Sequence, residues 1–150
     1  MGWLNDDLLG RCLKKFFSAD PPAIAVQVTT HCVRRFQVCL DELHNDSTTV
    51  TFYGAYATAQ REGQRRGRPT PAITFGHNKD HRPDLKQLLY VLTLSQDGAV
   101  PVHFRVCSGN VQDDQTHRET WDFLHHLAGH ADFLYVADCK LATMENMTYI

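Results

Sequence analysis

With 150 residues, the chain has the usual length of one domain and is long enough to bury a hydrophobic core. Hydrophobic residues make up 43% of it and charged residues 21%, as in ordinary folded proteins, and the net charge of −2 gives no bulk basicity that would indicate nucleic-acid binding. Any contact with DNA must therefore be local. No apolar run approaches the roughly 18 residues that span a bilayer, and the first residues lack the pattern of a signal peptide, so we expect a cytoplasmic protein.

The cysteines and histidines do not have the spacing of a zinc site. The five cysteines are scattered and never form C-x-x-C, so we interpret them as reduced thiols. His126 and His130 are four residues apart and His125 adds a third imidazole, but no glutamate follows His126 as the H-E-x-x-H motif requires. Gly129 should also end the helix before His130, so we expect no zinc site.

Two amphipathic helices are predicted in the first third of the chain. Asn5 can cap a helix whose apolar residues recur every three or four positions, and the DPP run 20–22 ends it. Pro22 then suits the first turn of a second helix. Because both helices carry an apolar face, we expect them to pack on each other. The apolar positions are Leu8, Leu9, Cys12, Leu13, Phe16 and Phe17 in the first helix and Ile24, Val28, Cys32, Val33 and Phe36 in the second.

A change of period after residue 44 predicts that the rest of the chain forms a sheet. The run NDSTTVTFYG is dense in β-branched and aromatic residues, with Asp46 and Val50 on one face, and Gly54 ends it. Residues 88–94 and 100–106 alternate as strands, and the Asp-Gly pair 97–98 between them indicates a hairpin. Residues 55–75 combine glycine, proline and arginine, which indicates a basic, flexible loop.

A helix and a final strand complete the predicted order. Thr116 and Glu119 have the spacing of a capping box, and Gly129 suits the end of the helix that the box would open. The last run, DFLYVAD, is apolar between its two aspartates, which is typical of a strand buried on both faces, and it stops at Asp138. The predicted fold class is therefore α/β, with a strand, a β-hairpin, a helix and a strand after a helical segment over residues 1–44.

The predicted order of strands and helix allows two aspartates to form a metal site. A right-handed crossover through the helix would bring the last strand back parallel to the sheet. If it lies beside the first strand, Asp46 and Asp138, which are 138 − 46 = 92 residues apart, become neighbours on a sheet edge. Two close carboxylates repel each other unless a cation lies between them, so such a pair is a natural Mg²⁺ or Mn²⁺ site for phosphoryl transfer. The residues alone leave a simpler alternative open, in which Asp46 belongs to a turn and Asp138 caps a helix.

Several blocks together resemble one family. NDSTTVTFYGAY, GHNKDHRPDLKQ, FRVCSGNVQDD and FLYVADCKLATMEN stand in the order and spacing seen in DDE transposases of bacterial insertion sequences, and LNDDLLGRCLKKFF is similar to the helical segment before their core. The resemblance implies an RNase H-like, retroviral-integrase-like catalytic core over residues 45–150. It also implies a Mg²⁺ or Mn²⁺ cofactor, double-stranded DNA as substrate, a homo-oligomer on paired DNA ends and a nucleoid-associated location in a bacterial cytoplasm.

The resemblance assigns two of three catalytic residues. Asp46 matches the first catalytic aspartate and Asp138 the second, and both would bind the metal. The third, a glutamate on a helix after a further strand, has no match. Glu145 follows Asp138 by only seven residues and should lie on the intervening helix, so we reject it as the third ligand. On this basis the chain is expected to be an internal piece of a transposase.

The block GHNKDHRPDLKQ concentrates charge before an apolar strand, and two interpretations of it stay open. In one, basic side chains contact DNA phosphates near the scissile bond, where each contact releases counterions. In the other, Asp80, Arg82, Asp84 and Lys86 form ion pairs and a turn around Pro83. The arginines of residues 55–75 could form a phosphate-contacting loop, but the sequence favours a solvated linker. The candidate DNA-contacting residues are Lys79, His81, Arg82, Lys86, Arg65, Arg66 and Arg68.

The block SGNVQDD is equally ambiguous by itself. Gly109 and Asn110 suit an ordinary turn, and Asp113 or Asp114 suits a helix cap. Two functions then follow from the whole sequence. The first is a piece of a transposase that, when intact, cuts and joins DNA ends by metal-dependent phosphoryl transfer. The second is a catalytically inactive remnant that binds DNA or the full-length transposase, and the unmatched glutamate favours it for this chain alone.

Overall fold

The computed structural model describes residues 5–65, 67–77 and 81–150, apart from the side chains of Arg65 and Arg68. It divides the chain into two compact units, Met1–Gln37 and Val38–Ile150. The division falls before the boundary that the change of sequence period indicated at residue 44, because strand β1 already begins at Glu42. No helix within the described ranges is both long and apolar enough to cross a membrane.

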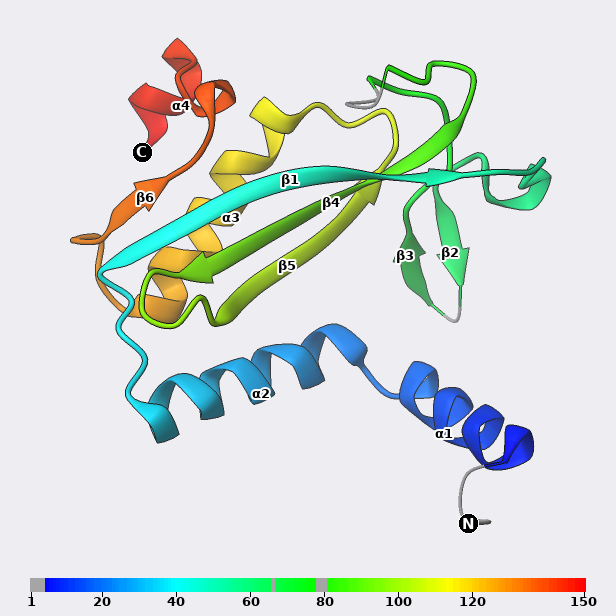
Figure 1. Ribbon diagram of the computed structural model, residues 1–150, viewed down its shortest axis with the longest axis horizontal. Coiled ribbons are helices and arrows are strands. Elements are labelled where there is room, and N and C mark those ends of the chain that lie inside the picture. The colour runs from blue at the N-terminus through cyan, green and yellow to red at the C-terminus, as the bar shows by residue number, and fades with distance from the viewer. Residues whose placement is uncertain (1–4, 66, 78–80) are drawn as a thin grey trace. The chain divides into compact units, whose positions relative to one another are not determined.

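The first unit contains the two predicted helices, α1 (Asp6–Ser18) and α2 (Pro21–Phe36) (Figure 1). Asn5 caps α1 by accepting a hydrogen bond from the backbone N–H of Leu8 at 2.8 Å, as predicted. Asp20 caps α2 in the same way. The expectation that these helices pack on each other is wrong, since neither helix contains a buried residue. Two short helices joined by a tight connection follow one another along the chain, so their apolar faces find no cover within this unit.

The second unit is built on a mixed four-stranded sheet with the order β5-β4-β1-β6. The strands are β1 (Glu42–Phe52), β4 (Lys86–Ser95), β5 (Pro101–Ser108) and β6 (Leu134–Val136). β4 pairs antiparallel with β1 and with β5, and the turn between β4 and β5 contains Gly98 at φ 72°. The β-hairpin that the Asp-Gly pair predicted is therefore confirmed. β6 pairs parallel with β1, so the predicted parallel return of the last strand is also confirmed.

Helix α3 (Asp113–Ala128) connects β5 to β6 and covers one face of the sheet (Figure 1). Trp121 packs on Phe133 with ring centroids 4.6 Å apart, and Leu43, Val91 and Leu124 are fully buried in this layer. α3 begins at Asp113, three residues before the helix start that the capping box predicted, because the Thr116 hydroxyl donates to the carbonyl of Asp113 inside the first turn. Gly129 ends the helix at φ 79°, as predicted.

Two predictions on the remaining elements are wrong. Residues 55–75 are not one flexible loop, because they contain the short helix η1 (Ala57–Ala59) and the hairpin of β2 (Gly63–Arg65) and β3 (Arg68–Thr70). β6 is not buried on both faces. Phe133 and Tyr135 are buried against α3, whereas Leu134 is 58% exposed on the opposite face. After β6, the chain forms η2 (Cys139–Leu141) and α4 (Met144–Tyr149).

Candidate functional site

Asp46 lies on the face of β1 that points away from α3. Leu43 and Asn45 are buried, and His44, Asp46 and Thr48 alternate with them as exposed residues, because side chains of a strand point to opposite faces in turn. Oδ1 of Asp46 accepts a hydrogen bond from the backbone N–H of Ser47 at 2.7 Å. This local bond fixes the orientation of the carboxylate at the middle of the strand.

Asp138 lies two residues beyond the end of β6, where it caps η2. Its Oδ1 accepts a hydrogen bond from the backbone N–H of Lys140 at 2.9 Å. The alternative in which Asp138 caps a helix is therefore confirmed as a local role. A cap uses one carboxylate oxygen, so this role is compatible with a second role for the other oxygen.

The pairing of β1 with β6 brings the strand that ends before Asp138 beside the strand that carries Asp46. The parallel ladder joins Glu42 to Leu134 and His44 to Val136, and both pairs are 92 residues apart. Asp46 and Asp138 have the same separation, so they would be the next pair on this face if the ladder continued by two residues. Adjacent strands are about 4.7–4.9 Å apart. The prediction that the two residues belong to neighbouring parallel strands is therefore correct for the strands, although Asp138 itself follows the last paired residue.

The donor set suits a hard divalent cation. Carboxylate oxygens are the ligands that Mg²⁺ and Mn²⁺ prefer, and both aspartates are exposed to solvent. Within residues 5–65, 67–77 and 81–150, no three histidine, cysteine, aspartate or glutamate side chains form a group that could hold a metal ion. Asp138 also acts on α3, where burial lowers the pKa of His117 and the negative charge of Asp138 partly opposes this shift.

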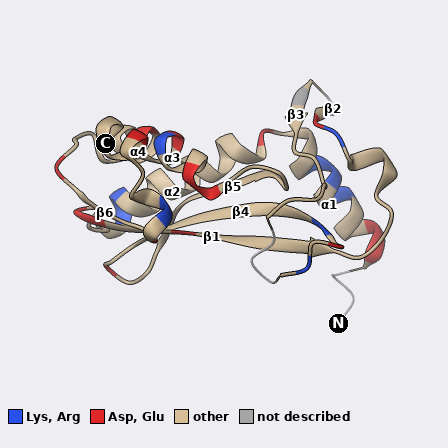
Figure 2. Cartoon of the chain, turned by 90° about the horizontal axis from the view of Figure 1, so that it is seen from above, with Lys and Arg blue, Asp and Glu red and all other residues tan. Residues whose placement is uncertain are grey.

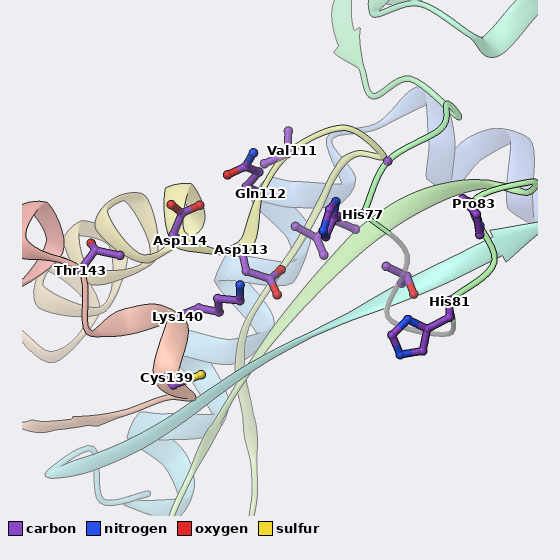
Figure 3. A pocket seen from close by; sticks show the side chains of 13 residues that line it. His77, His81, Pro83, Val111, Gln112, Asp113, Asp114, Cys139, Lys140 and Thr143 are labelled. Atoms are coloured by element: carbon purple, nitrogen blue, oxygen red, sulfur yellow. The ribbon is translucent and has the colours of Figure 1, made fainter.

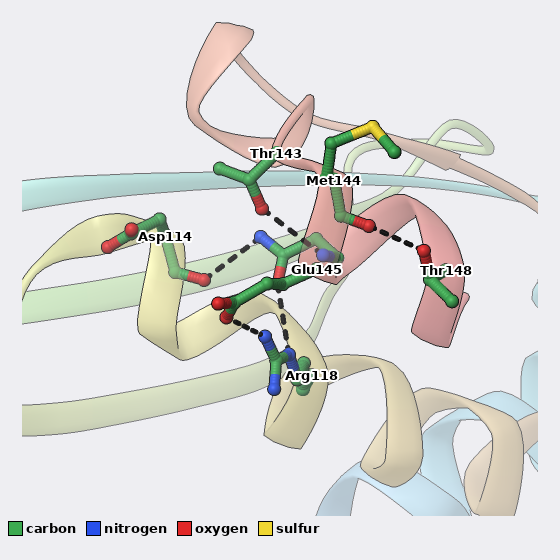
Figure 4. Close-up of polar contacts among 7 residues, drawn as sticks. Asp114, Arg118, Thr143, Met144, Glu145 and Thr148 are labelled. Atoms are coloured by element: carbon green, nitrogen blue, oxygen red, sulfur yellow. Dashed lines mark hydrogen bonds and ion pairs between the residues drawn. The ribbon is translucent and has the colours of Figure 1, made fainter.

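Glu145 is occupied by another interaction, which agrees with its rejection as the third ligand. It lies on α4, and its carboxylate forms an ion pair of 2.5 Å with Arg118 on α3 (Figure 4). Arg118 also donates to Asn146, whose side-chain amide in turn donates to the backbone carbonyl of Asp114. Glu145 therefore helps to attach α4 to α3.

The ion-pair interpretation of GHNKDHRPDLKQ is confirmed for Arg82 and Asp84, whereas Lys86 binds elsewhere. Arg82 binds Asp84 through two hydrogen bonds of 2.7 and 2.8 Å, and Asp84 raises the pKa of the guanidinium further above its usual value. Lys86 is only 8% exposed, donates to the carbonyl of Ala55 and lies 5.7 Å from the ring centre of Phe75. A DNA phosphate would reach Lys86 only after rearrangement, whereas Arg82 and His81 are exposed.

The side chains of the other candidate DNA-contacting residues lie outside the part of the chain that the structure describes. Lys79 and Arg66 lie outside the described residues, and so does Asp80 of the predicted ion-pair network. Arg65 and Arg68 are described by their backbone alone, which pairs them opposite each other at the end of the β2–β3 hairpin. Acidic and basic residues are interspersed along the elements of the second unit (Figure 2), as the low net charge predicted.

A cavity beside Asp138 was not predicted from the sequence. Cys139 and Lys140, which follow Asp138 directly, line it together with Asp113 and Asp114 at the start of α3. His77 and His81 line it from the segment that precedes β4 (Figure 3). The two aspartates before α3 were visible as possible caps, but nothing in the sequence indicates that they face the residues after β6. Only the return of β6 beside β1 brings these segments together.

Comparisons with known protein families, with curated proteins and with solved structures found no match to this chain. The resemblance to DDE transposases therefore rests on the sequence blocks themselves, and the functional argument rests on the geometry of Asp46 and Asp138.

Proposed function

We propose that the chain is part of the catalytic core of a DDE-type transposase of a bacterial insertion sequence, which cuts and joins DNA ends by metal-dependent phosphoryl transfer. The observation that carries this proposal is the parallel pairing of β1 with β6 at an offset of 92 residues. This offset equals the separation of the two motif aspartates. Strands that lay apart in the sheet, or that paired in another register, would have argued against a shared site.

The strand order supports a finer assignment of the fold. The resemblance implies a strand, a hairpin, a helix and a strand, and the chain has β1, the β4–β5 hairpin, α3 and β6 in that order. β1 lies between the hairpin and the returning strand. We therefore assign the second unit to an RNase H-like sheet.

In the proposed site, Asp46 and Asp138 hold the cation through carboxylate oxygens. The backbone amides of Ser47 and Lys140 orient these carboxylates, and each amide also stabilises the negative charge. Bound Mg²⁺ would activate the attacking hydroxyl and stabilise the leaving oxygen of the DNA strand. Because two-metal chemistry normally uses a further acidic ligand and Glu145 is paired with Arg118, this chain supplies two of the ligands in the proposal. We expect it to bind metal but not to cleave DNA by itself.

Manganese binding tests this proposal directly. Mn²⁺ titrations followed by electron paramagnetic resonance should show binding that weakens at least about tenfold, or about 1.4 kcal/mol, in Asp46→Asn and in Asp138→Asn. Asp41→Asn and Asp132→Asn remove a carboxylate near the opposite ends of β1 and β6, so they are matched controls and should bind as the unchanged protein does.

Equal Mn²⁺ affinity in all four variants would refute the proposed site. Fluorescence anisotropy, which measures DNA binding, distinguishes a catalytic core from the alternative function, an inactive remnant that binds DNA. DNA binding without any Mn²⁺ binding at the aspartates would favour an inactive DNA-binding remnant over a catalytic core.

A further inference from the structure

Strand β5 forms one edge of the sheet. It pairs with β4, and among the described residues the order β5-β4-β1-β6 places no strand on its other side. Along a strand of an antiparallel ladder, alternate residues turn their backbone N–H and C=O groups to opposite sides. About half of the backbone groups of β5 therefore face outward, where a further strand can exchange hydrogen bonds with them.

The protection that edge strands usually have is confined to the start of β5. Such strands are kept from pairing by lysine, by proline, by a bulge or by a covering segment. Pro101 is the first residue of β5, and the bulge in its ladder with β4 lies between Pro101 and His103. From His103 to Ser108 the ladder is regular and the strand contains neither lysine nor proline. This part of the edge is open to pairing.

Contacts on both faces hold β5 in an extended form. On the side of α3, Arg105 forms an ion pair with Glu119. On the face that points away from α3, which we call the open face, Phe104 stacks on Tyr90 of β4 with ring centroids 6.4 Å apart. Because the strand is already ordered in the single chain, a partner strand would not have to order it on binding.

The sequence of β5 is complementary to itself in antiparallel orientation. If Arg105 lies on a two-fold axis, Phe104 of each copy lies opposite Val106 of the other copy, on the open face. Cross-strand pairs of an aromatic and a β-branched residue contribute about 0.2–1 kcal/mol each. Phe104 is 49% exposed and Val106 is 43% exposed in the single chain, so this alignment covers apolar surface on both copies.

The charges on the side of α3 fit the same alignment. The two Arg105 side chains would meet at the axis, and like charges directly opposite each other are unfavourable. Each guanidinium is already paired with Glu119, whose side chain is 62% exposed. The axis would therefore hold two positive and two negative charges, and the attraction of each Arg105 to both glutamates offsets the repulsion between the arginines.

We propose that two copies of this chain pair through β5 in antiparallel orientation, with Phe104 opposite Val106 of the second copy, so that their sheets become continuous. The contact is isologous, and each favourable pair occurs twice. One pair of edges is small beside the interfaces of about 1,200–2,000 Å² in stable complexes, so the dimer forms reversibly. The contact uses neither Asp46 nor Asp138, and it requires no metal ion and no DNA.

Sedimentation velocity without metal or DNA tests the edge. A species of 34.2 kDa (2 × 17.1) should appear beside the single chain of 17.1 kDa, and its share should grow with concentration. Val106→Lys places a charge on the edge strand and should reduce this species at least about tenfold. The matched control is Val50→Lys, because Val50 is 44% exposed on the same face but lies in the inner strand β1. This control should keep the dimer.

Disulfide trapping tests the register. Phe104→Cys and Val106→Cys, mixed and mildly oxidised, should form a crosslinked dimer, since directly opposite Cα atoms are about 4.5–5.5 Å apart. Each variant alone should crosslink at least about tenfold more slowly, because diagonal neighbours are about 7–8 Å apart. Met144→Cys, at a position on α4 that is 84% exposed, measures random collisions. All variants carry serine in place of the four cysteines that are not buried, Cys12, Cys32, Cys39 and Cys139.

Three outcomes would overturn the inference. A single species of 17.1 kDa at every concentration would refute the dimer. Equal dimer fractions in Val106→Lys and Val50→Lys would refute the edge as the contact. Crosslinking of the mixture no faster than that of either variant alone, or than that of Met144→Cys, would refute the register. Circular dichroism checks that the lysine variants are folded, and if Val106→Lys is not, the disulfide test of the mixture decides.

Discussion

Gly76 of the block GHNKDHRPDLKQ and Gly109 of the block FRVCSGNVQDD lie where backbone segments approach each other closely. A Cβ atom on Gly76 would collide with the carbonyl oxygen of Gly109, and one on Gly109 would collide with the carbonyl oxygen of Gln87. Gln87 donates from its side chain to Gly109 at 2.8 Å, and Gly109 donates to Ala72 at 3.1 Å. Backbone segments approach each other here at a distance that only glycine permits. Both glycines are therefore needed by the fold.

Gly109→Ala should lower the free energy of unfolding by about 2–4 kcal/mol, because backbone must move to make room for the methyl group. The matched control is Gly10→Ala in α1, where a Cβ would meet nothing within 4 Å. That change should be neutral or stabilising by up to about 1 kcal/mol, since alanine favours the helix. Urea denaturation followed by circular dichroism measures both. Equal stability of Gly109→Ala and the unchanged protein would contradict the account.

His103 predicts how stability depends on pH. Its ring packs on Phe123 with centroids 4.4 Å apart, and burial, assisted by the nearby charge of Arg105, lowers its pKa from 6.5 to about 4. In the unfolded chain His103 takes up a proton below pH 6.5, but the folded protein resists this until about pH 4. Its contribution to stability is therefore complete above pH 6.5 and is lost as the pH falls toward 4.

His103→Phe should remove this part of the pH dependence while it keeps the aromatic contact. Between pH 7 and pH 4 the variant should lose about 1–2 kcal/mol less free energy of unfolding than the unchanged protein does, since partial exposure reduces the full effect. His126→Phe makes the same change at an exposed position and should keep the original pH dependence. Thermal or urea unfolding at several pH values measures this, and parallel curves for His103→Phe and the unchanged protein would disprove it.

At the scale of elements, the attachment of α4 to α3 depends on one buried amide. Asn146 is 1% exposed, donates to the carbonyl of Asp114 at 3.0 Å and accepts from Arg118 at 3.3 Å (Figure 4). The ion pair of Arg118 with Glu145 and the bonds of Tyr149 to Asp122 lie at the exposed rim, where such interactions contribute little. A helix as short as α4 has marginal stability without tertiary contacts, so Asn146 should decide whether it stays folded.

Asn146→Ala should destabilise the α3–α4 attachment by about 1–3 kcal/mol, because the buried carbonyl of Asp114 loses its donor. Hydrogen exchange at the backbone amides of Met147 and Ile150, which donate within α4, should accelerate accordingly. Met147→Ala changes a side chain of the same helix that is 62% exposed, and it should leave the exchange rates nearly unchanged. Similar rates in Asn146→Ala and Met147→Ala would argue against this role of Asn146.

At the scale of the whole molecule, the sheet has an apolar face opposite α3. The alternation of β4 places Tyr90 and Leu92 on that face, and Tyr90 stacks on Phe104 of β5 at 6.4 Å. Phe104 is 49% exposed, Val106 43% and Leu134 58%. β6 is also an edge strand, and exposed edges and apolar patches favour association.

We expect the purified chain to self-associate through this face. Phe133 and Tyr135 are buried against α3, so the test depends on Leu134, which is exposed between them. Leu134→Lys should reduce the apparent mass in light scattering, whereas Met147→Lys, at an exposed apolar position on α4, should not. A monodisperse monomer for the unchanged protein would show that the face is not an association surface.

Local patterns in the sequence determined most elements of the second unit and both candidate metal ligands. Strand alternation, the Asp-Gly hairpin signal and helical periodicity depend on neighbouring residues, so β1, β4, β5 and α3 could be predicted without the fold. The capping box failed because Thr116 bonds inside a helix that had already begun at Asp113. The packing of α1 on α2 failed because an apolar face predicts burial but does not specify the partner.

Only the tertiary structure decided which distant residues meet. The parallel pairing of β1 with β6 joins residues that are 92 positions apart, and it brings the strand that precedes Asp138 beside the strand that carries Asp46. The same return of the chain places Cys139 and Lys140 opposite Asp114, and it assigns Glu145 to Arg118 rather than to a metal. These contacts join residues that are far apart in sequence, so no local pattern records them. The residue types at the site were therefore set by the sequence, and their geometry by the closure of the sheet around α3.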